Sequence, residues 1–340
     1  MRIAQVAPLY ESVPPRAYGG TERVVSHLTE ELVRQGHTVT LFASGDSVTT
    51  ARLIAPCRRA LRLDPHCREP LAPHVLLLEQ VFTEPTRFDL LHFHLDSLHY
   101  PLARRHRTPH VTTLHGRLDL PDLVPLYREF RAMPVVSISD AQRAPLPWLN
   151  WQGTVYHGLP AARYPFGAAP EPYLAFLGRL APEKGADRAI AIARRVGLPL
   201  KIMGKIDAAD RAYFEAVIAP RLHEPFVEYL GEVGEGEKAA VLGHAYALLF
   251  PIEWPEAFGL VLIEAMACGT PIIAYRRGSV PEVLEEGVTG FVVEDLEAAV
   301  KAVERVAGFD RARCRQAVEA RFSVARMAQD YLRIYRRLVA

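Results

Sequence analysis

The chain has 340 residues, 49% of them hydrophobic and 23% charged, and its formal net charge at pH 7 is +1. This length predicts two domains of roughly 160 residues each, and the small net charge argues against nucleic acid as the main partner, because that partner requires a concentrated basic surface. No apolar run reaches the ~18 residues that span a bilayer, so any membrane association is expected to be peripheral.

The first half of the chain alternates short apolar segments with amphipathic helical segments, as in a parallel sheet covered by helices on both faces. A helix is predicted over 21–35, where four aliphatic residues share one side and Gly36 ends the pattern. Strands are predicted at 2–7, 37–43, 75–78, 89–94, 110–114, 135–139 and 154–157.

The same alternation restarts after a break at 159–172 (LPAARYPFGAAPEP), which is rich in Pro and Ala and has no period. Further strands are predicted at 173–178, 198–203, 226–230, 246–250, 271–275 and 290–293. We therefore expect an α/β protein with two Rossmann-like, doubly wound parallel-sheet domains and a cleft between them. The expected parts are a first domain at 1–160, a linker at 161–172, a second domain at 173–322, and a helix at 323–340 that packs back on the first domain.

Cysteine content and the start of the chain indicate the compartment. The four cysteines have no metal-ligand spacing, and they are too few for a disulfide scaffold in a chain of this length. The opening MRIAQVAPLY is too short and too quickly interrupted for a secretory signal. We therefore expect a cytoplasmic protein.

Residues 256–271 (EAFGLVLIEAMACGTP) are the most informative part of the sequence. They follow an apolar strand, and their apolar residues then recur at helical spacing until a Gly and a Pro end the helix. The backbone N–H groups of Phe258, Gly259 and Leu260 lie at the positive end of this helix, where phosphate binds.

Two acids eight residues apart belong to the same segment. Glu264 falls about one turn inside the helix, where its two oxygens can accept both hydroxyls of a ribose. Glu256 lies just before the helix, where it would be beside the group attached to the phosphates. The segment therefore predicts a nucleotide sugar as the ligand.

Two cations follow the first strand of the second half, in the loop GRLAPEKG at 178–185. Arg179 suits bidentate contact with phosphate oxygens, and Lys184 acts as a point charge. Because a helix is expected from about Gly185, both cations lie on a strand-to-helix loop and can converge on an anion. We interpret them as ligands of the diphosphate.

Four further candidates lie near the ends of predicted strands. Gly19 and Gly20 open the first helix, where glycine lets the backbone approach a ligand and the helix end is positive. His115 ends a strand, and a histidine there can donate a hydrogen bond to a sugar or to a developing charge. Gly204, after the strand at 198–203, completes the expected donor-binding set.

Two other patterns have competing interpretations. Residues 234–239 (GEGEKA) match a loose dinucleotide fingerprint, but two glutamates in the loop would repel a pyrophosphate, so we interpret the segment as a helix start. His92 and His94 could suggest a metal, yet no third ligand stands at a fixed spacing, and a packed strand is the better interpretation.

Taken together, these motifs resemble those of retaining glycosyltransferases of family 4, which have the two-Rossmann architecture called GT-B. The resemblance covers nearly the whole chain, and its most specific part is the pair of glutamates in EAFGLVLIEAMACGTP. The other matching motifs are MRIAQVAPLY with its glycine pair, TLHG, GRLAPEKG, GSVPE at 278–282 and GVTG at 287–290.

The resemblance implies how the donor phosphates are held. Arg179 and Lys184 would bind the diphosphate and stabilise it as the leaving group, with help from backbone amides of Gly20 and of 258–260. No metal or other cofactor is expected, because cationic side chains and helix ends replace a divalent ion. Retention is explained by attack of the acceptor on the face that the phosphate leaves, with that phosphate assisting as base.

The resemblance implies that the domain at 1–160 is on the acceptor side and that the domain at 173–322 binds the nucleotide sugar. It also assigns residues to the ribose and the sugar. Glu264 would hold the ribose, Glu256 would contact hydroxyls of the transferred sugar, and His115 would lie beside that sugar. Family members often have Asn-Gly where this chain has His157-Gly158.

The sequence therefore predicts a metal-independent glycosyltransferase that moves a sugar from a nucleoside diphosphate donor, expected to be a UDP-sugar, with retention of configuration. The alternatives are a nucleotide-sugar epimerase, hydrolase or phosphorylase on the same fold, and a non-catalytic nucleotide-sugar-binding subunit. The acceptor and the oligomeric state stay open. A basic stretch at 52–68 suggests an anionic or membrane-borne acceptor, with peripheral contact at the inner membrane face.

Overall fold

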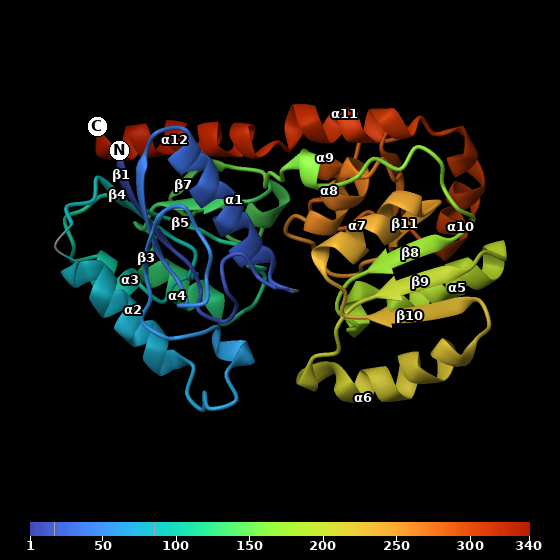
Figure 1. Ribbon diagram of the computed structural model, residues 1–340, viewed down its shortest axis with the longest axis horizontal. Helices are drawn as coiled ribbons and strands as arrows, with labels where there is room; N and C mark the ends of the chain where they lie inside the picture. The colour runs from blue at the N-terminus through green and yellow to red at the C-terminus, as the bar shows by residue number, and fades with distance from the viewer. Residues whose placement is uncertain (17, 85) are drawn as a thin grey trace. The chain divides into compact units, whose positions relative to one another are not determined.

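The computed structural model describes residues 1–16, 18–84 and 86–340, and the chain divides into two compact units. Unit 1 consists of Met1–Gly158 and Val324–Ala340, and unit 2 consists of Leu159–Ser323. Each unit is a parallel sheet with helices packed around it (Figure 1). The predicted fold class, α/β with two doubly wound sheets, is confirmed.

Unit 1 has a seven-stranded sheet in the order β3-β2-β1-β4-β5-β6-β7. The strands are β1 (Arg2–Val6), β2 (Thr38–Phe42), β3 (Arg52–Ile54), β4 (Leu90–Phe93), β5 (His110–Thr113), β6 (Val135–Ser137) and β7 (Trp151–Thr154). The helices are α1 (Gly20–Arg34), α2 (Leu71–Thr83), α3 (Tyr100–Ala103), α4 (Leu123–Glu129) and α12 (Val324–Val339). The central strands β1 and β4 are buried along nearly their whole length, as expected where helices cover both faces of a parallel sheet.

The predictions for unit 1 differ from the structure in three places. Residues 75–78 lie inside helix α2, because a short apolar run does not distinguish a strand from a buried helix. The buried residues of α2 recur at helical spacing, at His74, Leu77, Leu78 and Val81. Strand β3 was missed inside the basic stretch, and the last strand of the sheet, β7, lies a few residues before the predicted 154–157.

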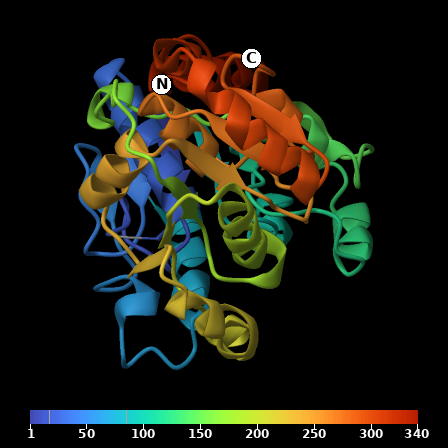
Figure 2. The ribbon, with the colours of Figure 1, turned by 90° about the vertical axis from the view of Figure 1, so that its right-hand side faces the viewer.

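Helix α12 returns from the end of the chain to unit 1, where it packs against α1 (Figure 1). Its buried residues follow a helical period and include Met327, Tyr331 and Tyr335. Both chain ends belong to unit 1, and both are marked at the top of the view in Figure 2. An amphipathic helix far along the sequence is thus part of the core of the first unit.

Unit 2 has a six-stranded sheet in the order β10-β9-β8-β11-β12-β13. The strands are β8 (Leu174–Leu177), β9 (Leu200–Met203), β10 (Val227–Gly231), β11 (Ala247–Phe250), β12 (Ile272–Tyr275) and β13 (Gly290–Val293). The helices are α5 (Ala186–Val196), α6 (Arg211–Tyr213), α7 (Glu235–His244), α8 (Leu260–Ala267), α9 (Val280–Val283), α10 (Leu296–Arg305) and α11 (Arg311–Arg321). Helix α5 packs on α10, and α8 packs on α7 and α11.

The segment predicted as a linker, 161–172, belongs to unit 2. Tyr164 is buried there, and its carbonyl accepts a hydrogen bond from Arg315 at 2.7 Å. The N–H of Gly167 donates to the carbonyl of Cys268 at 2.9 Å. Composition suggested a spacer, but these long-range contacts fix the segment to the unit that follows it.

In both sheets, the strands that follow the first strand in sequence are added on one side of it, and the later strands are added on its other side. This change of direction falls between β1 and β4 in unit 1 and between β8 and β11 in unit 2. Ligands of doubly wound sheets bind outside the carboxyl ends of the strands at such a point. In the described part of the chain, no helix is both long and apolar enough to cross a membrane.

Candidate functional site

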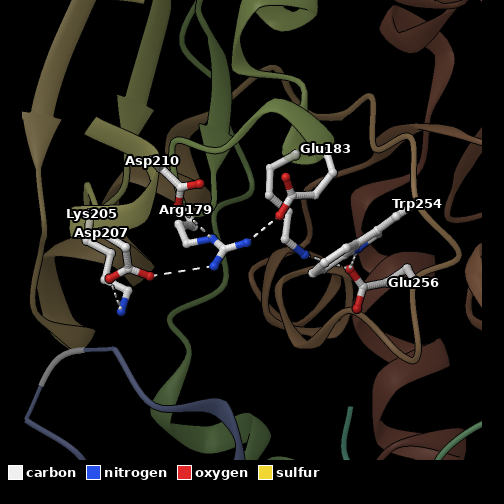
Figure 3. A network of polar contacts seen from close by, with 8 residues as sticks. Arg179, Glu183, Lys205, Asp207, Asp210, Trp254 and Glu256 are labelled. Atoms are coloured by element: carbon white, nitrogen blue, oxygen red, sulfur yellow. Dashed lines mark hydrogen bonds and ion pairs between the residues drawn. The ribbon is translucent and has the colours of Figure 1, made fainter. Parts of the chain in front are cut away.

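Arg179 comes directly after β8, at the carboxyl end of a central strand of unit 2. Its guanidinium forms an ion pair with Glu183, and lies 3.6 Å from the Asp207 carboxylate and 3.3 Å from the Asp210 carboxylate. Figure 3 shows these acids around the guanidinium. Arg179 is thus placed where the sequence predicted it, but carboxylates of its own unit already balance its charge. An incoming anion must compete with them.

Lys184 and Glu256 come from the loops after β8 and β11, and they meet at the point where the strand order changes. The Lys184 Nζ donates to Glu256 Oε2 at 2.8 Å, and the two side chains are only 17% and 13% exposed. Trp254 Nε1 donates to the same oxygen at 3.3 Å, and its ring lies 4.5 Å from Lys184 Nζ. Two residues that the sequence predicted separately therefore form one contact, joined by a tryptophan that was missed.

The charge state of Glu256 follows from these neighbours. Burial by itself raises the pKa of this carboxyl. Lys184, the Trp254 indole and the backbone N–H of Phe258 together outweigh that effect, and they hold the pKa below its ordinary value. Glu256 is therefore ionised at neutral pH, and it can accept hydrogen bonds but cannot donate them.

The helix predicted after Glu256 is α8, and it begins at Leu260. Gly259 caps it with φ +80°, a left-handed conformation that favours glycine. The Phe258 side chain is buried in unit 2 with its ring 5.9 Å from that of Phe322. The buried Phe258 side chain thus holds the loop in place, and the backbone N–H of Phe258 donates a hydrogen bond to the Glu256 carboxylate.

Glu264 lies inside α8, and its carboxylate already has a cation and a hydroxyl as partners. Lys238 Nζ donates to Glu264 Oε1 at 2.5 Å, and the Tyr164 hydroxyl donates to the same atom at 3.2 Å. The Lys238 and Glu264 side chains are 10% and 6% exposed. Sequence reasoning missed Lys238, although it lies in the 234–239 segment that we interpreted as a helix start. That interpretation is confirmed, because Gly234 caps α7.

Gly204 follows β9 beside the loop of Arg179. A Cβ at this position would lie 1.9 Å from the carbonyl oxygen of Gly178, which follows the neighbouring strand β8. The close approach of these two strand ends therefore requires glycine here, whether or not a donor binds. Sequence reasoning placed the residue correctly near the candidate site without seeing this reason.

In unit 1, Gly19 caps α1 and Gly20 is its first residue, after the loop that follows β1. His115 lies beyond the carboxyl end of β5, and its Nε2 is 2.8 Å from Nδ1 of His94. The ring of His157 stacks on that of His115, with centroids 5.4 Å apart and planes inclined by 17°. Burial lowers the pKa of His115 to about 3, so its imidazole is neutral.

His92 and His94, the pair that could have suggested a metal, are buried and have hydrogen-bond partners inside unit 1. His92 Nε2 lies 2.7 Å from Thr113 Oγ1, and His94 Nε2 lies 2.9 Å from Gln5 Oε1. Over residues 1–16, 18–84 and 86–340, no group of three or more His, Cys, Asp or Glu side chains is arranged to hold a metal ion.

Comparisons with known proteins identify the family of the chain. A family model described as Glycosyltransferase Family 4 matches residues 18–196, and one described as Glycosyl transferases group 1 matches residues 166–319. The chain is 29% identical over 369 residues to a glycogen synthase of Mycobacterium tuberculosis, which covers 89% of this chain and 86% of that protein.

Solved structures show the same architecture. A glycosyltransferase involved in avilamycin A biosynthesis superposes with a TM-score of 0.76 at 25% identity, over 100% of this chain and 98% of that one. Anabaena HepE, solved in complex with UDP and glucose, has the same fold with a TM-score of 0.75 at 19% identity, over 99% and 100% of the two chains. The expected GT-B class is confirmed. Motifs, sheet topology and family matches thus lead to one conclusion: this chain belongs to glycosyltransferase family 4, and it is a hexosyltransferase-type enzyme.

Proposed function

We propose that the protein is a retaining glycosyltransferase that takes its sugar from a UDP-sugar and needs no metal ion. The observation that carries this proposal is the 2.8 Å contact between Lys184 and Glu256 beside the N-terminal end of α8. It puts a cation suited to phosphate and a carboxylate suited to sugar hydroxyls next to each other. The UDP and glucose bound to HepE support the same donor class.

When the donor binds, its diphosphate replaces carboxylates of the protein as the partner of Arg179 and Lys184. The diphosphate competes with Glu183, Asp207 and Asp210 for Arg179, and with Glu256 for Lys184. Once Lys184 turns to a phosphate oxygen, the Glu256 carboxylate can accept hydrogen bonds from the transferred sugar. The Glu264 carboxylate, held by Lys238, is proposed to accept hydrogen bonds from the ribose.

The same cations assist the reaction. As the bond between the sugar and the diphosphate breaks, negative charge grows on the departing phosphate. Arg179 and Lys184 stabilise that charge more strongly than the charge of the bound donor, and this difference lowers the barrier. In the proposed route the acceptor attacks on the face that the phosphate leaves, and that phosphate takes the acceptor proton.

A ligand screen followed by a transfer assay tests the three parts of the proposal. UDP should raise the melting temperature more than GDP or ADP, because a ligand of the folded state stabilises it in proportion to its affinity. Transfer to a panel of sugar and polyol acceptors should continue in EDTA, and NMR of the product should show the anomeric configuration of the donor. A larger shift with ADP or GDP, rescue by Mg²⁺, or an inverted product would each overturn the corresponding part.

The same assay separates transfer from the alternative activities. An epimerase or a hydrolase releases sugar or UDP without an acceptor, and a binding subunit releases neither. We expect UDP release that depends on the acceptor.

Peripheral membrane contact through 52–68 and a cytoplasmic location also stay proposals. Two arginines of this stretch pair with acids of unit 1: Arg52 with Glu84 at 3.0 Å and Arg62 with Glu11 at 2.8 Å. Their charge is therefore partly balanced by protein groups. If the protein does not co-sediment with anionic vesicles at low salt, the membrane proposal is wrong.

A further inference from the structure

A chain of buried polar groups connects His115 to helix α12 inside unit 1. His115 Nε2 lies 2.8 Å from His94 Nδ1, and His94 Nε2 lies 2.9 Å from the amide oxygen of Gln5. The amide nitrogen of Gln5 donates to the Tyr335 hydroxyl at 3.2 Å. Gln5 belongs to β1 and Tyr335 to α12, so this small network joins opposite ends of the sequence.

The network continues from Tyr335 through a second histidine. The Tyr335 hydroxyl lies 2.6 Å from His92 Nδ1, and His92 Nε2 lies 2.7 Å from Thr113 Oγ1. The Thr113 hydroxyl in turn contacts the Tyr331 hydroxyl at 2.9 Å. Tyr335 is thus the junction between the Gln5 amide and His92.

All of these titratable groups are neutral. Burial lowers the pKa values of His92 and His94 well below the ordinary range. Burial also raises the pKa values of the Tyr331 and Tyr335 hydroxyls. A neutral imidazole has one N–H and one nitrogen lone pair, so each hydrogen bond in the network determines the direction of the next.

The amide oxygen of Gln5 sets that direction. Because this oxygen only accepts, His94 must donate to it from Nε2, which leaves a lone pair on His94 Nδ1. His115 must then donate from its Nε2 to His94, and its Nδ1 carries the remaining lone pair. On the other side, the Gln5 amide N–H donates to Tyr335, whose O–H donates to His92.

We propose that Gln5 and His94 are positioning residues that hold His115 as the Nε2–H tautomer, so that its Nδ1 accepts a hydrogen bond from a hydroxyl of the substrate sugar. This inference rests on the proposed function in one respect, namely that His115 lies beside the sugar. It reverses the role expected from the sequence, in which His115 donates. Turning the Gln5 amide over would reverse every bond of the chain, because the Tyr335 hydroxyl can either accept or donate, so the orientation of this amide sets the His115 tautomer.

The first test is the tautomer itself, measured on the full chain without any ligand. Long-range ¹H–¹⁵N NMR correlations distinguish Nε2–H from Nδ1–H histidines, and His115→Asn identifies the signals. We expect His115 to be Nε2–H in the unaltered protein and to become a mixture of tautomers in Gln5→Met. An Nδ1–H signal in the unaltered protein, or a pure Nε2–H signal in folded Gln5→Met, would overturn the proposal.

Matched variants keep this test decisive. His99 is another buried histidine of unit 1, with Nε2 2.8 Å from Thr112 Oγ1 and no part in the network above. Thr112→Val should change the His99 signals and leave the His115 tautomer as it is. If Gln5→Met does not fold, Tyr335→Phe removes the hydroxyl that accepts from the Gln5 amide N–H and should also produce a mixture; an unchanged tautomer there counts against the proposal.

The second test determines whether His115 accepts the hydrogen bond from the sugar hydroxyl or donates one to it. Donor analogues in which each sugar hydroxyl is replaced in turn by hydrogen or by fluorine should reveal one position where both changes weaken binding about 10-fold. Fluorine cannot donate, so it would retain part of the bond only if His115 were the donor. The loss should be smaller in Gln5→Met, where only part of the molecules have the accepting tautomer. If the tautomer is as expected but no UDP-sugar binds, the proposed function fails and the positioning network stands.

Discussion

The two units place very different chemistry at the carboxyl ends of their central strands. In unit 1, the candidate side chain His115 belongs to a buried, neutral network with His94 and Gln5. In unit 2, the candidate side chains are ions: Arg179 lies among three acids, Lys184 pairs with Glu256, and Glu264 pairs with Lys238. A neutral network selects a partner by the direction of its hydrogen bonds, whereas ions select it by charge. The proposed donor has a group for each, because its sugar is uncharged and its phosphates are anionic.

The largest expected effect concerns the buried ion pair of unit 2. Lys238→Met leaves the Glu264 carboxylate buried without its cation, and the loss of one partner of such a pair costs about 3–5 kcal/mol of unfolding free energy. Urea unfolding of the full chain measures it. The control is Arg195→Ala, which removes an exposed pair with Glu297 in the same unit and should cost roughly 0.2–1 kcal/mol. Equal losses of unfolding free energy in the two variants would mean that burial does not make the Lys238–Glu264 pair more important than an exposed pair.

The next effect concerns catalysis. Arg179→Ala and Lys184→Ala each remove a cation from the proposed leaving-group site, and turnover should fall on the order of 100-fold or more. Steady-state kinetics with a UDP-sugar measure this loss. Arg194→Ala, near the far end of α5 and paired with Glu224, is the matched control and should keep the original rate. Unchanged transfer kinetics in both site variants would remove the basis of the assignment.

The smallest expected effect is the stability that each buried histidine of unit 1 removes as the pH falls. The pKa values of His92, His94, His115 and His157 are lowered by burial in the folded state, so below their ordinary value near 6.5 only the unfolded chain binds these protons. Each histidine therefore removes about 1.4 kcal/mol of stability per pH unit as the pH falls below ~6.5. For Glu256 in unit 2, whose pKa is lowered from 4.5, the corresponding loss begins only nearer pH 4.5.

Hydrogen exchange followed by mass spectrometry resolves the two units in the intact protein as the pH is lowered. We expect peptides of unit 1 to lose protection first, between about pH 6.5 and 5. Earlier loss in unit 2 would contradict the contrast between neutral and charged networks.

Sequence reasoning could predict the parts of the site that are local. Arg179, Lys184 and Glu256 lie on short loops after apolar strands, and the topology of a parallel sheet brings such loops to one edge. The same reasoning failed at 75–78, where an apolar run of helix α2 has no local feature that separates it from a strand.

The partners that set charge and direction could not be predicted. Lys238 reaches Glu264 across 26 residues, and Gln5 reaches Tyr335 across 330. No spacing rule connects positions so far apart, because only the completed packing of strands and helices brings them together. The sequence therefore indicated the candidate residues better than it indicated the residues that hold them in place.

The return of α12 to the first unit also has a consequence for synthesis. Residues 159–323 form unit 2 as one uninterrupted stretch, so this unit can fold while the chain is still leaving the ribosome. Unit 1 cannot be completed at that time, because Tyr331 and Tyr335 emerge only after all of unit 2. The unit that is translated first is therefore finished last, and until then its polar interior, including Gln5 and His92, lacks the hydroxyls that complete it.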